Sequence, residues 1–116
     1  MVSSNTLVMS DIERIVYDYL VKKGIEFQFQ TSLMGGWYSL GGAVVDFLFE
    51  DRRLAWRIQG EYYHKGVEKE GSDIVQRELL ENMGWIVVDI FGDDIKDPTR
   101  LEQTMRLALQ GREVLR

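Results

Sequence analysis

Apolar residues recur at helical spacing in three stretches of the chain, over residues 11–23, 73–83 and 98–110. A period of 3.6 places residues three or four positions apart on one face of a helix, so each stretch is predicted to bury one face. A residue suited to capping precedes each stretch, and a glycine follows it. The predicted caps are Ser10 with Glu13 as a capping box, Ser72, and Asp97; the residues predicted to pack inward are Ile12, Ile15, Val16, Tyr19, Leu20, Val75, Leu79, Leu80, Met83, Leu101, Met105, Ala108 and Leu109.

Shorter apolar segments predict four strands. Residues 26–30 alternate between apolar and polar, as a half-buried strand does. The segments 43–49 and 54–60 are joined by the short connection 50–53, so they are predicted to form an antiparallel hairpin. Residues 85–91 are a nearly continuous apolar run, which is typical of a strand buried on both faces.

The predicted order is therefore helix, three strands, helix, strand and helix. This order is most simply built as a mixed sheet with helices packed on both faces. The charged segment 65–71 is predicted to be a solvated loop, and Asp93-Asp94 an exposed acidic turn. Because no repeat, low-complexity tract or linker divides the sequence, we expect one α/β domain over residues 1–116.

The composition agrees with a small globular domain and excludes several kinds of chemistry. The chain has 116 residues, of which 45% are hydrophobic and 28% charged, as in an ordinary soluble protein. It contains no cysteine, which excludes disulfides, thiol catalysis and cysteine-rich zinc sites. No apolar run approaches the roughly 20 residues that span a bilayer, and the N-terminus lacks the regions of a signal peptide, so we expect a cytoplasmic protein.

The net charge of −5 weighs against nucleic-acid binding, because phosphate recognition normally uses a basic surface. Carboxylates that hold a cation raise the acidic count, however, without repelling DNA once the ion is bound. The charge therefore lowers the expectation of DNA binding but leaves DNA open as a partner.

Asp46 is the first candidate for chemistry, because it interrupts an apolar strand between Val45 and Phe47. A carboxyl group in this position costs free energy unless another group pairs with it. Strict alternation places Val45 and Phe47 on one face of the strand and Asp46 on the other. The sequence therefore predicts a functional carboxyl group at Asp46.

Polar side chains on the next strand extend this candidate site. Arg57, Gln59 and Glu61 share one face, and they converge with Asp46 if the two polar faces coincide. Two carboxylates with one or two backbone carbonyls can hold Mg²⁺, for which Mn²⁺ can substitute. Such an ion activates a water and stabilises charge on a phosphodiester.

Four segments of the chain follow one another in a characteristic order: Gly-Ala-Val-Val-Asp46-Phe, Gly60-Glu61-Tyr62-Tyr63-His64, Asp73-Ile-Val-Gln-Arg77-Glu-Leu-Leu, and Gly84-Trp85-Ile86-Val87-Val88. Together they resemble the PD-(D/E)xK nuclease superfamily, and within it small domains similar to the very short patch repair endonuclease and phage Holliday junction resolvases. The resemblance extends from the first helix to Phe91. It implies a restriction-endonuclease-like α-β-β-β-α-β core, and metal-dependent cleavage of DNA, including branched or junction DNA, by a homodimer.

The resemblance also implies roles for individual residues. Asp46 matches the metal-binding aspartate of the family, and Glu13 a glutamate that some members add to the metal site. His64 matches a histidine that assists a water or a phosphate. Asp73 and Arg77 match a pair on the following helix that orients this histidine or contacts DNA. The DNA contacts are assigned to Arg57, Lys65 and Arg77.

The third strand departs from the family pattern. Arg57 stands where the family has an acid and Gln59 where it has a lysine, and arginine cannot bind a cation. In one interpretation Glu61 supplies the second carboxylate, while Gln59 and His64 position water or phosphate. In the other, the chain is a catalytically degenerate nuclease fold that binds DNA or a protein partner.

Several of these residues also have ordinary structural explanations. Glu13 is explained as the capping-box residue, Glu61 as a solvated residue at a strand end, and His64 as a surface residue. Arg57 is explained as an ion-pair partner of Asp46. These explanations stay open on the sequence alone.

Overall fold

The computed structural model describes residues 9–33, 43–60 and 67–114, with side chains described throughout these ranges except at 31–33, 43–44 and 67–73. None of the helices in these ranges has the length and apolarity that a bilayer crossing requires. The predicted order of elements is confirmed, with two short helices, η4 and α3, in addition. In chain order the elements are α1 (Asp11–Lys23), β1 (Gln28–Leu33), β2 (Ala43–Phe49), the 3₁₀ helix η4 (Glu50–Arg52), β3 (Leu54–Gln59), α2 (Val67–Asn82), β4 (Ile86–Phe91), α3 (Gly92–Ile95) and α4 (Pro98–Leu109).

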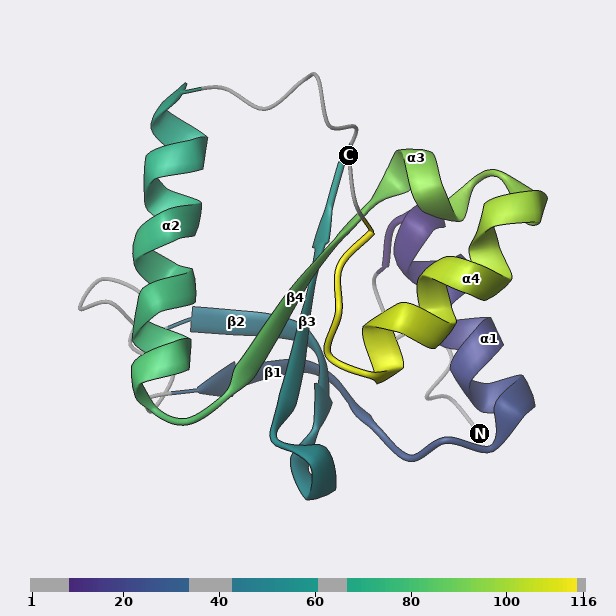
Figure 1. Ribbon diagram of the computed structural model, residues 1–116, viewed down its shortest axis with the longest axis horizontal. Coiled ribbons are helices and arrows are strands. Elements are labelled where there is room, and N and C mark those ends of the chain that lie inside the picture. The colour runs from purple at the N-terminus through teal and green to yellow at the C-terminus, as the bar shows by residue number, and fades with distance from the viewer. Residues whose placement is uncertain (1–8, 34–42, 61–66, 115–116) are drawn as a thin grey trace.

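The four strands form one mixed sheet in the order β1-β2-β3-β4. The pairs β1–β2 and β2–β3 are antiparallel, and β3–β4 is parallel. Figure 1 shows α2 on one face of the sheet and α1, α3 and α4 together on the other. The predicted α/β architecture, with a mixed sheet and helices on both faces, is confirmed.

Each face of the sheet has its own hydrophobic cluster. The larger cluster joins α1, α3 and α4 to the sheet, and the smaller one joins α2 to it. The larger comprises Val16, Leu20, Phe47, Phe49, Leu54, Trp56, Val88, Ile90, Ile95, Met105 and Ala108; the smaller comprises Val45, Leu48, Ala55, Leu80, Trp85 and Val87. Burial of apolar surface on both faces stabilises the sheet and fixes where its strand ends lie.

Local signals place α1 as predicted. The Ser10 hydroxyl accepts a hydrogen bond from the Glu13 backbone N–H at 3.1 Å, and the Glu13 carboxylate accepts one from the Ser10 N–H at 2.8 Å. Gly24 ends the helix with a φ of 70°, a left-handed conformation that glycine adopts without strain. The capping box holds Glu13 in the first turn.

Strict alternation fails in β2, which corrects the predicted faces of this strand. Phe47 and Phe49 pack in the larger cluster as predicted, but Val45 packs with Leu48 in the smaller one. Residues three apart cannot share a face in a regular strand. The irregularity lies at Asp46, between Val45 and Phe47.

The predictions for α2 were wrong at its start and on its face. The helix spans Val67–Asn82, so Ser72 lies inside it and does not cap it. Lysine and glutamate are good helix formers, so residues 67–71 of the charged segment belong to the helix where a loop was predicted. Leu80 is fully buried, but Val75 is 55% exposed and Met83 42% exposed. The residues of α2 that were predicted to pack inward thus extend beyond the part of the helix that packs on the sheet.

Two predictions near the end of the sheet were also wrong. Ile86 is 49% exposed, so β4 is not buried along its whole length. Asp94 was predicted to be in an exposed turn, but it lies in α3 and is buried, with a hydrogen bond from Arg100 Nη1 at 3.4 Å. A buried carboxylate of this kind requires such partners.

Trp56→Phe is expected to lower the free energy of unfolding by about 1–3 kcal/mol. The buried Trp56 Nε1–H donates to the Ala108 backbone carbonyl at 3.0 Å, and the substitution leaves this carbonyl near the end of α4 without that donor. Urea unfolding measures the loss. Trp85→Phe is the matched control, because the Trp85 ring instead lies under the Arg53 guanidinium at 4.1 Å. Equal losses in the two variants would contradict a specific role for the Trp56 hydrogen bond.

Candidate active site

The candidate active site begins where the β2–β3 ladder ends. The last residue pair of this ladder is Phe47 with Trp56. Beyond it, the Asp46 carboxylate accepts a hydrogen bond from the Ile58 backbone N–H at 2.7 Å. The side chain of Asp46 thus accepts from a backbone N–H that would otherwise pair with a neighbouring strand. This bond fixes the carboxyl group at the point where β2 leaves β3.

Glu13 on α1 is the second carboxyl group at this point. It lies close enough to Asp46 to raise the pKa of that carboxyl group, while it also accepts the capping bond from the Ser10 N–H. Two carboxyl groups can share a hydrogen bond only when one of them carries a proton. We refer to Glu13 and Asp46 as the carboxyl pair. Its two members come from different elements and meet because α1 packs on this face of the sheet.

Burial raises the pKa of Asp46 to about 7. The hydrogen bond with Glu13 and the negative charge of that residue also raise it. The Ile58 N–H and the positive charge of Arg57 act in the opposite direction. Near neutral pH, Asp46 therefore exchanges between the neutral and charged forms, as a carboxyl group does beside another carboxylate.

Arg57 and Gln59 converge on a different carboxylate, Asp89 of β4. Arg57 and Asp89 are register partners in the parallel β3–β4 pair. Arg57 Nε donates to Asp89 Oδ1 at 2.8 Å and Arg57 Nη2 to Oδ2 at 3.1 Å, and Gln59 Nε2 donates to Oδ1 at 3.1 Å. The side chains of Arg57 and Asp89 are only 6% and 10% exposed. The geometry is the bidentate one in which a buried arginine–carboxylate pair is strongest.

Arg77 of α2 and Glu113 complete this cluster. Arg77 Nη1 donates to Asp89 Oδ2 at 3.0 Å and to Glu113 Oε2 at 2.6 Å. Glu113 Oε2 also accepts from the Asp89 backbone N–H at 2.9 Å. We refer to these residues as the Asp89 cluster: Arg57, Gln59, Arg77, Asp89 and Glu113. Although burial opposes its ionisation, the Arg57 guanidinium lowers the pKa of Asp89 below its usual value.

The predicted convergence of Asp46 with Arg57 and Gln59 is therefore corrected. The structure brings Asp46 together with Glu13, and it brings Arg57 and Gln59 together with Asp89. The explanation of Arg57 as the ion-pair partner of Asp46 is likewise replaced, since its bidentate partner is Asp89. Asp46 on β2 and Asp89 on β4 lie on the two strands that flank Arg57. The register of β3 with β4 places Asp89 opposite Arg57 and so favours the pair with Asp89.

Three predicted site residues, Glu61, His64 and Lys65, lie outside the described residues, as does the side chain of Asp73. Within the described ranges, no group of three or more His, Cys, Asp or Glu side chains is arranged to hold a metal ion. Among the described residues, the carboxyl pair offers carboxyl oxygens, which are ligands of the kind that Mg²⁺ prefers.

Asp89 and Glu113 were not predicted as site residues from the sequence. Asp89 could have been found by the argument used for Asp46, because it also interrupts an apolar strand, between Val88 and Ile90. Glu113 carries no such signal. It follows the last helix in a polar segment, and only the fold brings it to β4.

No protein-family model and no curated protein matches this chain. Among solved structures, the chain is similar to the homing endonuclease I-Bth0305I catalytic domain, with 21% sequence identity and a TM-score of 0.64. The match covers 89% of this chain and 98% of that domain. The chain therefore has the fold of a homing endonuclease catalytic domain.

Proposed function

We propose that this chain is a single metal-dependent endonuclease domain of the PD-(D/E)xK type, which hydrolyses DNA phosphodiester bonds. The observation that carries the proposal is the carboxyl pair, in which Glu13 and Asp46 meet at the end of the β2–β3 ladder. The fold supports it, because the similar solved structure is the catalytic domain of a homing endonuclease. Fold alone does not define chemistry, so the residues of the site carry the argument.

The carboxyl pair fits a divalent cation. Below pH 7 the pair is held together by a proton, because the pKa of Asp46 is raised to about 7. Above this pH two negative charges lie side by side, and a cation that replaces the proton removes their repulsion. Mg²⁺ or Mn²⁺ bound there would supply a Lewis acid that lowers the pKa of a water and stabilises charge on the phosphate.

The backbone holds both carboxyl groups ready for this role. The Ile58 N–H fixes Asp46, and the Ser10 N–H fixes Glu13. Such preorganisation lowers the entropic cost of gathering ligands around an ion or a substrate. In the proposal, Glu61 supplies a further ligand and His64 positions water or phosphate. The role predicted for Gln59 is opposed by the hydrogen bond from its amide to Asp89.

DNA contacts by Arg57, Lys65 and Arg77 stay predictions. The contacts given above for Arg57 and Arg77 are to protein acceptors in the Asp89 cluster. Of these two side chains, Arg77 is 31% exposed and Arg57 6% exposed, so Arg77 has the better access to a phosphate. Action on branched or junction DNA, and a homodimer that presents two sites, belong to the same proposal.

The second candidate function is a nuclease fold that binds DNA or a protein without cleaving. It is favoured by Arg57, which stands at the family's acid position and is bound in a buried pair with Asp89. The two functions differ in metal binding. A degenerate module needs no ion at the carboxyl pair, whereas the endonuclease does.

Titration with Mn²⁺ is expected to detect a site whose apparent affinity rises with pH. Below pH 7 the ion must displace the proton of Asp46, so affinity is expected to rise about tenfold per pH unit between pH 5 and 7 and to level off above. Isothermal calorimetry in buffers of different ionisation enthalpy measures both the affinity and the released proton. Absence of Mn²⁺ binding at pH 8 would overturn the endonuclease proposal and leave the binding module.

Two variants separate the capping role of Glu13 from its proposed ligand role. Glu13→Gln retains an oxygen for the Ser10 N–H but loses the charge, so it is expected to weaken Mn²⁺ binding with little effect on the helix. Ser10→Ala removes the hydroxyl that accepts from Glu13 N, so it is expected to lower stability by about 1 kcal/mol and to retain the ion. The reverse pattern would assign Glu13 to capping alone.

A further inference from the structure

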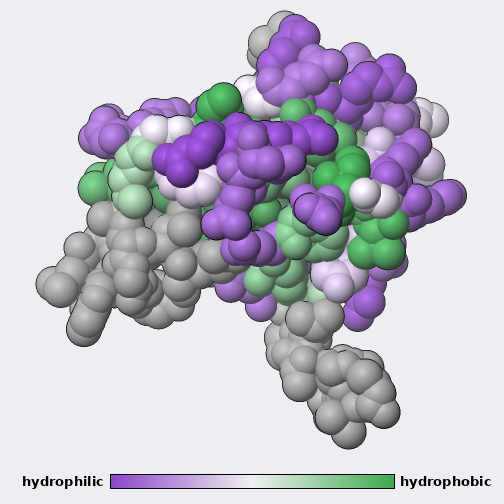
Figure 2. Space-filling view, turned by 90° about the horizontal axis from the view of Figure 1, so that it is seen from below, coloured by the Kyte–Doolittle hydropathy of each residue, from purple (hydrophilic) through white to green (hydrophobic). Residues whose placement is uncertain are grey.

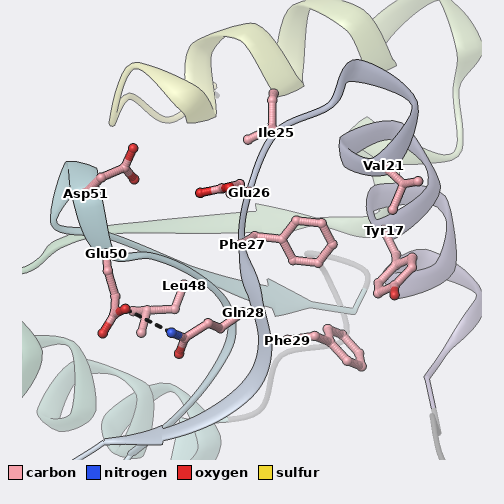
Figure 3. A pocket seen from close by; sticks show the side chains of 10 residues that line it. All are labelled: Tyr17, Val21, Ile25, Glu26, Phe27, Gln28, Phe29, Leu48, Glu50 and Asp51. Atoms are coloured by element: carbon pink, nitrogen blue, oxygen red, sulfur yellow. Dashed lines mark hydrogen bonds between the residues drawn. The ribbon is translucent and has the colours of Figure 1, made fainter. Parts of the chain in front are cut away.

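A groove of about 700 Å³ lies beside α1, one to two helical turns along the chain from Glu13. Figure 3 shows that the second half of α1, the connection to β1, the start of β1 and the turn after β2 all contribute to its lining. Its walls combine aromatic rings, from Tyr17, Phe27 and Phe29, with carboxylates, from Glu26, Glu50 and Asp51. We refer to it as the aromatic groove.

The apolar part of the aromatic groove is built from rings packed edge to face. The Tyr17 ring lies 5.2 Å from that of Phe27 and 5.7 Å from that of Phe29, both in T-shaped contacts. Val21, which also lines the groove, is 57% exposed. Figure 2 shows apolar surface between hydrophilic side chains on the face seen from below. The rings thus form a fixed apolar floor that is open to solvent.

The acidic part of the groove contains carboxylates that have no side-chain partner among the described residues. Glu50 accepts a hydrogen bond from Gln28 Nε2 at 2.9 Å. Glu26 and Asp51 form no side-chain hydrogen bond or ion pair with any other residue that the structure describes. In Figure 3 the carboxylate of Glu26 points to the side on which Asp51 lies. Two carboxylates beside an apolar floor attract a cation that carries apolar atoms.

We propose that the aromatic groove binds a basic segment of a partner protein, in which lysine or arginine alternates with an apolar residue. The basic head groups pair with Glu26 and Asp51, and their stems and the apolar residue cover the rings. A guanidinium placed over an aromatic face adds a cation–π contact. DNA does not fit this surface, because its phosphates meet carboxylates of the same sign.

The partner's charge also suits the rest of the chain. With a net charge of −5, the chain attracts basic proteins at long range. A second copy of the chain carries the same net charge and is a poorer occupant of an acidic groove. The groove shares no lining residue with the carboxyl pair, and the proposal does not depend on nuclease activity.

The test uses the full chain labelled with ¹⁵N and the synthetic peptide acetyl-Lys-Leu-Arg-Phe-Lys-amide. Amide shifts are expected to change at residues 26–29 and 50–51, and not at Glu13 or Asp46. The acidic peptide acetyl-Glu-Leu-Glu-Phe-Glu-amide is expected not to bind. The double variant Glu26→Gln/Asp51→Asn is expected to weaken binding of the basic peptide about fivefold or more.

A matched double variant separates the groove from the net charge. Glu78→Gln/Glu81→Gln changes the charge by the same amount on α2, on the opposite face of the sheet, and is expected to bind the peptide within twofold of the wild type. Equal weakening in both double variants, shifts scattered over the whole surface, or equal binding of the acidic peptide would overturn the proposal. Shifts of the groove amides on dilution without peptide would assign the groove to a second copy and also overturn it.

Discussion

Asp46→Asn is expected to reduce DNA cleavage by at least about 100-fold and, at the same time, to stabilise the protein above neutral pH. The amide can keep both hydrogen bonds of the protonated carboxyl group, since its oxygen accepts from the Ile58 N–H and its NH₂ donates to Glu13. It cannot become negatively charged. The variant thus imitates the protonated pair and lacks the charge that would bind an ion.

The pH dependence of stability follows from the raised pKa of Asp46. In the unfolded chain Asp46 loses its proton near pH 3.8, and in the folded protein near pH 7. Between these values the folded state binds the additional proton, so the free energy of unfolding falls as the pH rises from 4 to 7. At pH 8 the expected loss is on the order of a few kcal/mol. Asp46→Asn is expected to remove this loss.

Cleavage of linear and branched DNA with Mg²⁺ or Mn²⁺ measures the first effect, and thermal unfolding at pH 5 and pH 8 the second. The melting temperature of Asp46→Asn is expected to exceed that of the wild type by several degrees at pH 8 and by much less at pH 5. Asp18→Asn, at an exposed acid of α1, is the control for the loss of one charge. Equal cleavage by wild type and Asp46→Asn would exclude the proposed metal ligand.

Asp89→Ala is expected to lower the free energy of unfolding by about 3–5 kcal/mol. The substitution leaves the Arg57 guanidinium, whose side chain is 6% exposed, without its bidentate acceptor. It also removes an acceptor of Gln59 and of Arg77. Breaking one side of a buried pair is costly because the remaining charge cannot return to water.

The double variant Arg57→Met/Asp89→Leu tests this explanation. It removes both charges together and is expected to be less destabilised than Asp89→Ala, measured by urea unfolding. Glu113→Gln, at a 38% exposed position in the same cluster, is expected to cost about 1 kcal/mol or less. A double variant less stable than Asp89→Ala would show that packing, and not the loss of the bidentate acceptor of Arg57, causes the destabilisation.

The fold could be predicted from the sequence wherever local signals act alone. The capping box, the short β2–β3 connection and the cap at Asp97 each determine a boundary within a few residues, and all were confirmed. Predictions failed where tertiary packing decides. The exposure of Val75 depends on how far α2 extends beyond the sheet, which no local pattern contains.

The candidate site was predictable only in part. Asp46 was found because its burial is costly, and the same argument would have found Asp89. Their partners could not be predicted. The irregularity at Asp46 moves Val45 to the other face of β2, so the alternation of residues no longer indicates on which face of the strand a side chain lies. The pair of Glu13 with Asp46 joins α1 to β2, and the link of Glu113 to Asp89 joins the C-terminal segment to β4. Contacts between elements distant in sequence depend on the assembled fold.

The bond from the Asp89 N–H to Glu113 has a consequence for assembly. β4 is an outer strand of the sheet, and outer strands offer unpaired backbone groups to other chains. Glu113 occupies one of these donors at 2.9 Å and places a carboxylate on the strand's free side. Extension of the sheet across β4 would have to displace this side chain and break its ion pair with Arg77. Glu113 thus protects this part of the edge against strand exchange and fibrous aggregation, and the proposed homodimer would use another surface.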